Sequence, residues 1–132
     1  VPQMDDALLQ QLGGDRAADL SNCMLLKGMF DRLSDEAAQP SFYSDLEADV
    51  AEECSRLATA GAVLHCAADR WSNGFVYVKF ESVRDCVAAV SRMHGRFFAK
   101  QRIIAQHMPE AEYDRKWPPA KQKRPERRGP QT

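Results

Sequence analysis

The sequence predicts an α+β fold in which a four-stranded antiparallel sheet carries two helices on one face. Three observations predict it: four short apolar runs rich in β-forming residues, two amphipathic segments with helical spacing, and their order β-α-β-β-α-β along the chain. A chain of 132 residues fits one such domain with an extension at each end. We place the domain at residues 22–108, an N-terminal extension at 1–21 and a C-terminal extension at 109–132.

The strands are predicted from residue type and alternation. Phe75–Phe80 is the clearest strand, because aromatic and β-branched residues fill it. Alternate side chains of a strand face opposite sides of the sheet, so Phe75, Tyr77 and Lys79 should lie together on one face. The other three strands are expected at residues 23–26, 62–67 and 102–107.

The two helices are predicted from apolar spacing and from their capping signals. The first should begin at Ser44, where Glu47 three residues later completes a capping box. The second should begin at Ser82, with Asp85 in the role of Glu47. A glycine that favours the end of a helix follows each segment: Gly61 and Gly95.

The two extensions carry weaker signals. Met4 to Leu12 fits a short helix that Gly13 halts, and Tyr113 to Trp117 fits one further turn. The chain is basic from Arg115 onward and is expected to be mostly flexible after residue 118. This tail is compatible with a nuclear-import signal, a nonspecific RNA contact or a plain linker.

Composition argues against several classes of protein. The formal charge of −1 does not draw the chain as a whole to nucleic acid, and no apolar run is long enough to predict a membrane span. The four cysteines form no CxxC pair, which predicts buried thiols and no metal site. The three histidines are scattered and no nucleotide-binding or nucleophile motif occurs, so we expect no catalysis and no cofactor.

The third strand narrows the type of fold. RNA-recognition motifs (RRMs) carry the pattern K/R-G-F/Y-G/A-F-V-x-F/Y there, and residues 73–80 match its glycine, its aromatic positions and its valine. Asn73 and Val76 depart from that pattern. The first strand departs further, because Met24 stands at the second position, where RNA-binding RRMs usually place a stacking ring. The sequence therefore resembles a ferredoxin-like RRM fold that lacks one RNA-binding platform.

Two further features resemble the U2AF-homology motif (UHM), a subfamily of RRM-folded domains that bind a peptide instead of RNA. One is the acidic helix at residues 45–54, and the other is the Arg-x-Phe motif at residues 96–98. Residues 112–117 are similar to the tail of some members. The resemblance spans Cys23 to Trp117, and within the family it is to the C-terminal domains of CAPER-type and large auxiliary-factor splicing proteins. It implies a non-catalytic, nuclear module of a pre-mRNA splicing factor.

The resemblance also implies a binding site for a basic peptide with one tryptophan, the UHM ligand motif. The tryptophan would insert between the first helix and the Arg-x-Phe motif, with Phe98 against one face of the indole and Arg96 against the other. Arg96 would pair with Glu53, and the acidic helix stripe would meet basic residues of the ligand. The implied peptide-binding residues are Asp45, Asp49, Glu52, Glu53, Arg96, Phe97 and Phe98.

Each of these features also fits a simpler interpretation. An acidic helix face is most often solvated, Phe98 is compatible with core packing, and Arg96 is compatible with an ordinary surface position. Self-association is another alternative, in which Trp71 or Trp117 enters the groove of a neighbouring copy.

The open sheet face offers a different function. A conventional RRM would bind single-stranded RNA there, and the candidate residues are Met24, Phe75 and Tyr77. The two aromatic residues are equally compatible with a cover formed by the C-terminal segment that bears Tyr113 and Trp117, or by the N-terminal helix. The position of that segment therefore separates the two interpretations.

Overall fold

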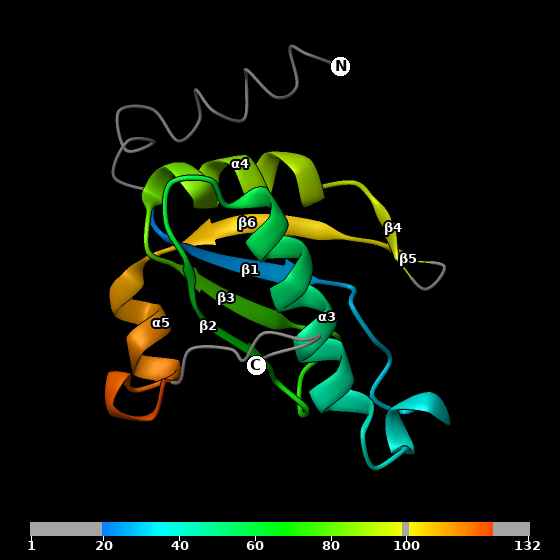
Figure 1. Cartoon of the computed structure of the whole chain (residues 1–132). Helices are drawn as coiled ribbons and strands as arrows, with labels where there is room; N and C mark the ends of the chain where they lie inside the picture. The colour runs from blue at the N-terminus through cyan, green and yellow to red at the C-terminus, as the bar shows by residue number, and fades with distance from the viewer. Residues whose placement is uncertain (1–19, 99–100, 123–132) are drawn as a thin grey trace, which may run out of the picture.

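A computed structural model describes residues 20–98 and 101–122 of the chain (Figure 1). The helix predicted over Met4 to Leu12 and the last part of the basic tail lie outside the described residues. In the described part the elements are β1 (Cys23–Lys27), η1 (Glu36–Ala38), α3 (Phe42–Leu57), β2 (Val63–Ala68), β3 (Val76–Phe80), α4 (Val83–Met93), β4 (Phe97–Phe98), β5 (Gln101–Arg102), β6 (Ile104–Met108), α5 (Glu110–Lys116) and η2 (Pro119–Lys121).

Four strands form the main sheet in the order β2-β3-β1-β6. All of its neighbouring strands are antiparallel. Helix α3 connects β1 to β2, and α4 leads from β3 toward β6, so each half of the domain is a strand-helix-strand unit. This connectivity confirms the predicted ferredoxin-like RRM fold.

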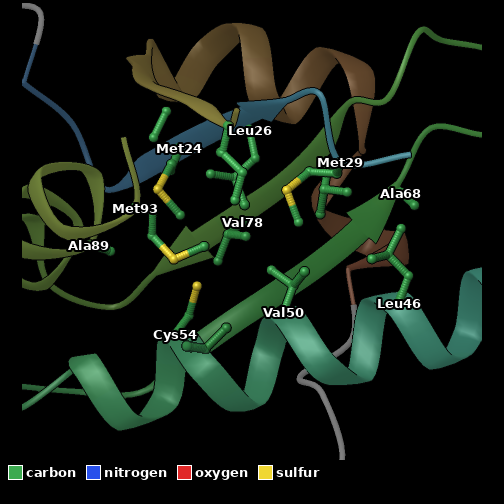
Figure 2. Packing of buried hydrophobic residues seen from close by; sticks show 14 of the residues in the cluster. Met24, Leu26, Met29, Leu46, Val50, Cys54, Ala68, Val78, Ala89 and Met93 are labelled. Atoms are coloured by element: carbon green, nitrogen blue, oxygen red, sulfur yellow. The ribbon is translucent and has the colours of Figure 1, made fainter. Parts of the chain in front are cut away.

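The main core lies between the sheet and the two helices α3 and α4. Figure 2 shows Leu46, Val50 and Cys54 pointing from one face of α3 toward the strands. Alternate residues of β3 meet them, because Val76, Val78 and Phe80 are fully buried in this core. Cys86, Ala89 and Met93 complete the core from α4. The predicted alternation of the third strand is therefore confirmed, with its even-numbered side chains beneath the helices.

Helix α3 begins at Phe42, two residues before the predicted start at Ser44. The Ser44 hydroxyl donates to the carbonyl of Ser41, and Glu47 accepts a hydrogen bond from the Ala68 N–H at 2.8 Å instead of closing a capping box. The rings of Phe42 and Tyr43 pack edge-on against Phe30. The two additional residues at the start of α3 therefore pack in an aromatic cluster with Phe30. The predicted capping box is wrong.

Helix α4 begins after Ser82 as predicted, and the Ser82 hydroxyl accepts a hydrogen bond from the Arg84 N–H at 3.1 Å. Asp85 takes no part in that cap, because its carboxylate accepts the N–H groups of residues 59–61 after α3. α3 itself ends at Leu57, so Gly61 lies in the connection and not at the end of the helix. The predicted cap at Ser82 is thus correct, and the predicted capping role of Asp85 is wrong.

The predicted fourth strand is divided. Gly95 adopts a positive φ of 86°, and the chain then forms a small hairpin in which Phe97 pairs with Arg102. The N–H of Ile103 donates to the carbonyl of Arg96 at 2.7 Å, which closes the base of this hairpin. The edge strand β6 starts only at Ile104, two residues after the predicted start.

The second face of the sheet is covered by α5. Fully buried Tyr113 packs there with Cys23, Leu25 and Tyr77 of the central strands, and Trp117 packs against their edge. The predicted C-terminal turn is therefore a helix of seven residues that closes a second, smaller core.

The four cysteines are free thiols, and Cys23, Cys54 and Cys86 are fully buried as predicted, while Cys66 is half-buried. No helix in the described part of the chain is long and apolar enough to cross a membrane.

Candidate functional site

An ion pair joins α3 to the segment that follows α4. Arg96 Nη1 lies 3.1 Å from Glu53 Oε2, and the same nitrogen lies 3.7 Å from the sulfur of Met93. Glu53 also pairs with Arg56 one turn further along α3. The backbone N–H of Arg96 donates to the carbonyl of Met93, which holds the Arg96 backbone close to the end of α4. The pairing expected between Arg96 and Glu53 is therefore present.

A small cavity of about 160 Å³ opens beside this ion pair. Cavities of about 150 Å³ lined by apolar side chains hold one benzene ring, so the cavity has the size of a single aromatic ring. Carboxylate and guanidinium groups stand at its edge, and most of the other lining side chains are apolar. The lining residues are Met29, Asp49, Val50, Glu53, Met93, Arg96, Phe97, Phe98 and Ile103.

A wider hollow of about 760 Å³ continues along the N-terminal half of α3. Its volume falls in the range of about 300–1,000 Å³ that ligand pockets occupy. The α3 helix, the loop after β1 and the β4–β5 hairpin form its walls. It shares Met29, Asp49 and Phe98 with the small cavity, so the two hollows meet at the Phe98 ring.

Six of the seven predicted peptide-binding residues line one or both hollows. Asp45 lines the wide one, Glu53, Arg96 and Phe97 line the small one, and Asp49 and Phe98 line both. Glu52 lines neither of these two hollows, because it is on an exposed side of α3. All three members of the predicted acidic stripe, Asp45, Asp49 and Glu53, thus line one or both hollows.

The phenylalanines of the Arg-x-Phe motif differ in their surroundings. Phe98 is half-buried against the main core and still lines both hollows, so it combines the packing role and the exposed role that the sequence left open. Phe97 is 67% exposed, and the guanidinium of Arg102 lies over its ring at 4.7 Å. Arg102 was not predicted as part of this region, and its position depends on the hairpin that the sequence did not reveal.

The apolar walls of the groove were also missed as site residues. Met29 and Ile103 are buried in the main core and line the small cavity. Met93 ends α4, is buried in the same core and also lines the small cavity. Their position in the sequence could have indicated this role, because Met93 and Ile103 lie on either side of the Arg-x-Phe motif.

The proposed RNA-contact residues lie on different faces of the sheet. Met24 is fully buried beneath the helices and pairs with Val78, so its assignment to the open face is wrong by one residue. Leu25 takes the position on the other face, opposite Tyr77. Successive side chains of a strand face opposite sides of the sheet, so the odd-numbered residues of β1 face α5 and Met24 faces the two helices.

The face that carries Tyr77 is closed by α5. Tyr77 is only 7% exposed, and its ring centroid lies 6.1 Å from that of Tyr113 and 5.5 Å from that of Trp117. Phe75 remains half-buried at the edge, with the ammonium of Lys27 at 5.5 Å from its ring. The sequence was compatible with an open or a covered sheet face, and in the structure α5 covers the face that carries Tyr77.

Polar contacts fasten α5 to the sheet. Lys79 Nζ lies 3.0 Å from both Asp114 and Glu110, and Lys116 Nζ lies 2.6 Å from Asp69 in the β2–β3 connection. Burial alone would lower the pKa of Lys79, but its hydrogen bonds to the two carboxylates and their charges outweigh burial and raise it. Lys79 is therefore a charged group held beneath the helix.

The two tryptophans differ in their availability. Trp117 is packed against the sheet, and its indole Nε1 is buried there without a hydrogen-bond partner among the described protein groups. Trp71 lies in the β2–β3 connection and is 84% exposed. Self-association through Trp117 would require α5 to leave the sheet, whereas self-association through Trp71 stays a prediction.

No family model matches the sequence. Among solved structures 95 chains match, and one of these, the RRM of RNA15, matches 70% of this chain and 94% of its own, with 13% identity and a TM-score of 0.47. The fold assignment rests on the strand order and the two helical connections. In the described part of the chain, no group of three or more histidine, cysteine and acidic side chains is placed to hold a metal ion.

Proposed function

We propose that this chain is a non-catalytic, UHM-type module that binds a tryptophan-bearing basic peptide of a pre-mRNA splicing factor in the nucleus. The observation that carries the proposal is the ring-sized cavity with Phe98 in its wall and the Glu53–Arg96 pair at its edge. The RRM fold serves both RNA-binding and protein-binding modules, so the site and not the fold decides between them.

The cavity suits an indole that enters from the side of α3. Its volume holds the six-membered ring, and the rest of the indole would lie in the mouth between Phe98 and Arg96. A phenylalanine ring and a guanidinium are both favourable neighbours for an aromatic face. Because the Arg96 guanidinium is already paired with Glu53, less of its side-chain entropy remains to be lost on binding.

The acidic side of the groove supports a basic ligand. Asp49 and Asp45 lie one and two turns before Glu53 on α3, and both line the wide hollow. Their charge would attract Lys and Arg residues next to the tryptophan and would fix the register of the peptide. Since such a peptide orders on binding, we expect micromolar affinity. The splicing role and the nuclear location rest on the resemblance to the UHM family.

A titration with a labelled synthetic peptide tests the proposal. The peptide has a run of lysines and arginines followed by one tryptophan, and fluorescence anisotropy measures its dissociation constant. Phe98→Ala should weaken binding about 30-fold, because it removes the ring against which the indole packs. Glu53→Lys should also weaken binding, because it releases Arg96 and repels the basic residues.

Two matched variants serve as controls. Glu52→Lys makes the same charge change one residue earlier, outside both hollows, and Phe75→Ala removes a phenylalanine on the other face of the sheet. Both should bind the peptide as the unmodified protein does. Equal affinities for Phe98→Ala, Glu53→Lys and the unmodified protein would refute the site.

Single-stranded RNA is the ligand that the alternative function requires. The cover of α5 over Tyr77 argues against it, because the ring that would stack on a base is already packed against Tyr113 and Trp117. A short RNA should therefore not bind in the same assay. RNA binding that Phe75→Ala abolishes and Phe98→Ala leaves intact would favour the alternative.

A further inference from the structure

We propose that the outer face of α4 is a docking surface for the N-terminal segment of the same chain, which packs there as a helix over residues 4–12. Val83 and Val87 are the apolar centre of this surface. Neither valine is among the residues that line the two hollows, so the inference is independent of the proposed peptide site. The segment itself lies outside the described residues.

The outer face of α4 carries an apolar stripe. Val83 and Val87 lie one turn apart on the helix, and 46% and 37% of their surfaces are exposed. Exposed Ala88 lies beside them. A β-branched residue loses side-chain freedom in a helix, so two exposed valines weaken α4 unless they pack against something. A stripe at this spacing is the pattern with which one helix packs on another.

Basic side chains flank this stripe. Arg84 and Arg92 are exposed on α4, two turns apart. Within α4, all of which the structure describes, the one carboxylate belongs to buried Asp85 and takes no part in the outer face. The outer face of α4 is therefore apolar and positively charged, and an occupant that complements it is apolar and acidic.

The N-terminal segment has both properties. Met4, Leu8 and Leu12 recur every four residues, so a helix over residues 4–12 presents them on one face. A helix of about nine residues is too short to be stable alone in water, so this pattern indicates a segment that becomes helical against another surface. Residues 1–19 contain four aspartates and one arginine: Asp5, Asp6, Asp15, Asp19 and Arg16.

The described chain begins beside α4. The backbone nitrogen of Ser21 lies 3.4 Å from His107 Nδ1, and the same ring nitrogen lies 3.6 Å from Cys86 Sγ of α4. Residues 13–19 can span about 24 Å at about 3.4 Å per residue, whereas the 11 residues of α4 extend over about 16 Å. The segment can therefore reach the whole outer face of α4 without displacing any described element.

The entry point also favours one direction. Cys86 belongs to the first half of α4, so the shortest connection places Leu12 near Val83. The helix over residues 4–12 then runs antiparallel to α4, with Asp5 toward Arg92.

Amide hydrogen exchange of the whole chain tests the inference. The amides of residues 8–12 should exchange at least about tenfold more slowly than those of an unstructured chain, because the docked helix holds them in hydrogen bonds. Val87→Asp should return them to the unstructured rate, because it places a carboxylate on the apolar stripe and against an acidic segment. Leu33→Asp is the matched control, since Leu33 is an exposed apolar residue of the loop after β1, and protection should persist.

A second pair of variants makes the same comparison within the segment. Leu8→Asp should abolish the protection, because residue 8 is at the centre of the proposed apolar face. Gln10→Asp introduces the same carboxylate on the opposite side of the helix and should leave most of the protection intact. Thermal unfolding checks that all four variants keep the folded domain.

Three outcomes would overturn the inference. The first is exchange at the unstructured rate in the unmodified protein. The second is protection that Leu8→Asp abolishes and Val87→Asp leaves unchanged, which would place the helix on another surface. The third is protection that rises with protein concentration together with a dimer in light scattering, which would show that the segment binds a second copy.

Discussion

The carboxylate of Asp85 is a buried charged group whose hydrogen bonds come from the backbone. It is 1% exposed, and its two oxygens accept hydrogen bonds of 2.8–3.1 Å from the N–H groups of Thr59, Ala60 and Gly61. Burial alone would raise the pKa of Asp85, but these hydrogen bonds and the charge of Arg84 outweigh burial and hold its pKa below the usual value. The Asp85 side chain of α4 thus accepts hydrogen bonds from the backbone N–H groups that follow α3.

Asp85→Asn should destabilise the protein by about 1–3 kcal/mol at pH 7, because the amide offers one acceptor oxygen to N–H groups that now share two. The contribution of a carboxylate with a lowered pKa is complete above its unfolded pKa of about 3.9 and is lost as the pH falls through the folded value. The difference between the two proteins in urea unfolding should therefore shrink below about pH 4. Glu81→Gln is the control, because Glu81 is an exposed residue that accepts one N–H, from Ala62, and its replacement should cost much less. Equal losses for both variants would contradict this account.

Asp85 also marks a limit of sequence reasoning. Its position three residues after Ser82 fits a capping box, and local spacing gives no sign that its partners lie more than twenty residues earlier in the chain. Met24 marks a similar limit: the first strand starts at Cys23 as predicted, but its first four residues are all apolar, so the sequence shows no alternation that separates the two faces. Such errors of one or two residues decide which side chains reach a surface.

At the scale of elements, α5 is held by buried polar contacts as well as by apolar packing. Tyr113 Oη lies 2.6 Å from His65 Nδ1, and both groups are buried between α5 and β2. Burial lowers the pKa of His65, and the positive charge of Lys79 lowers it further. The docked helix therefore favours neutral His65.

Mild acid should loosen α5. A histidine whose folded pKa is lowered supports the folded state fully above its unfolded pKa of about 6.5 and progressively less as the pH falls below that value. Hydrogen exchange of the Tyr113 and Trp117 amides, corrected for its intrinsic pH dependence, should show less protection at pH 5 than at pH 7. His65→Asn should remove this difference while lowering protection at both pH values. Protection that is independent of pH in the unmodified protein would contradict the role of His65.

The helices and the hairpin show what element-level prediction achieved. Apolar spacing located α3, α4 and the four main strands, because each buries one face against the same core. The hairpin of β4 and β5 escaped, since it has only two residues per strand and no periodicity to detect. Phe97 and Phe98 of the Arg-x-Phe motif form strand β4 of that hairpin. The sequence therefore indicated which residues belong to the candidate site, but not how the hairpin orients them.

For the whole molecule, α5 completes a domain that has two cores. Cys23, Leu25 and Tyr77 would form an apolar surface on the sheet if the helix were absent. A chain that ends after Met108 should therefore unfold at a lower temperature and self-associate, because it exposes this surface to water. Calorimetry and light scattering measure both effects. A chain that ends after Gln122 keeps α5 and its contacts, including the hydrogen bond from Gln122 to Asp114, and should behave as the full chain does. A monomeric, equally stable shorter chain would contradict the second core.

The Phe98 ring lines both hollows and separates one from the other. A ligand group that displaced this ring from one hollow would change the shape of the other, so occupancy of the two hollows would be thermodynamically linked, equally in both directions. Binding free energies measured separately for groups in the two hollows would then not add.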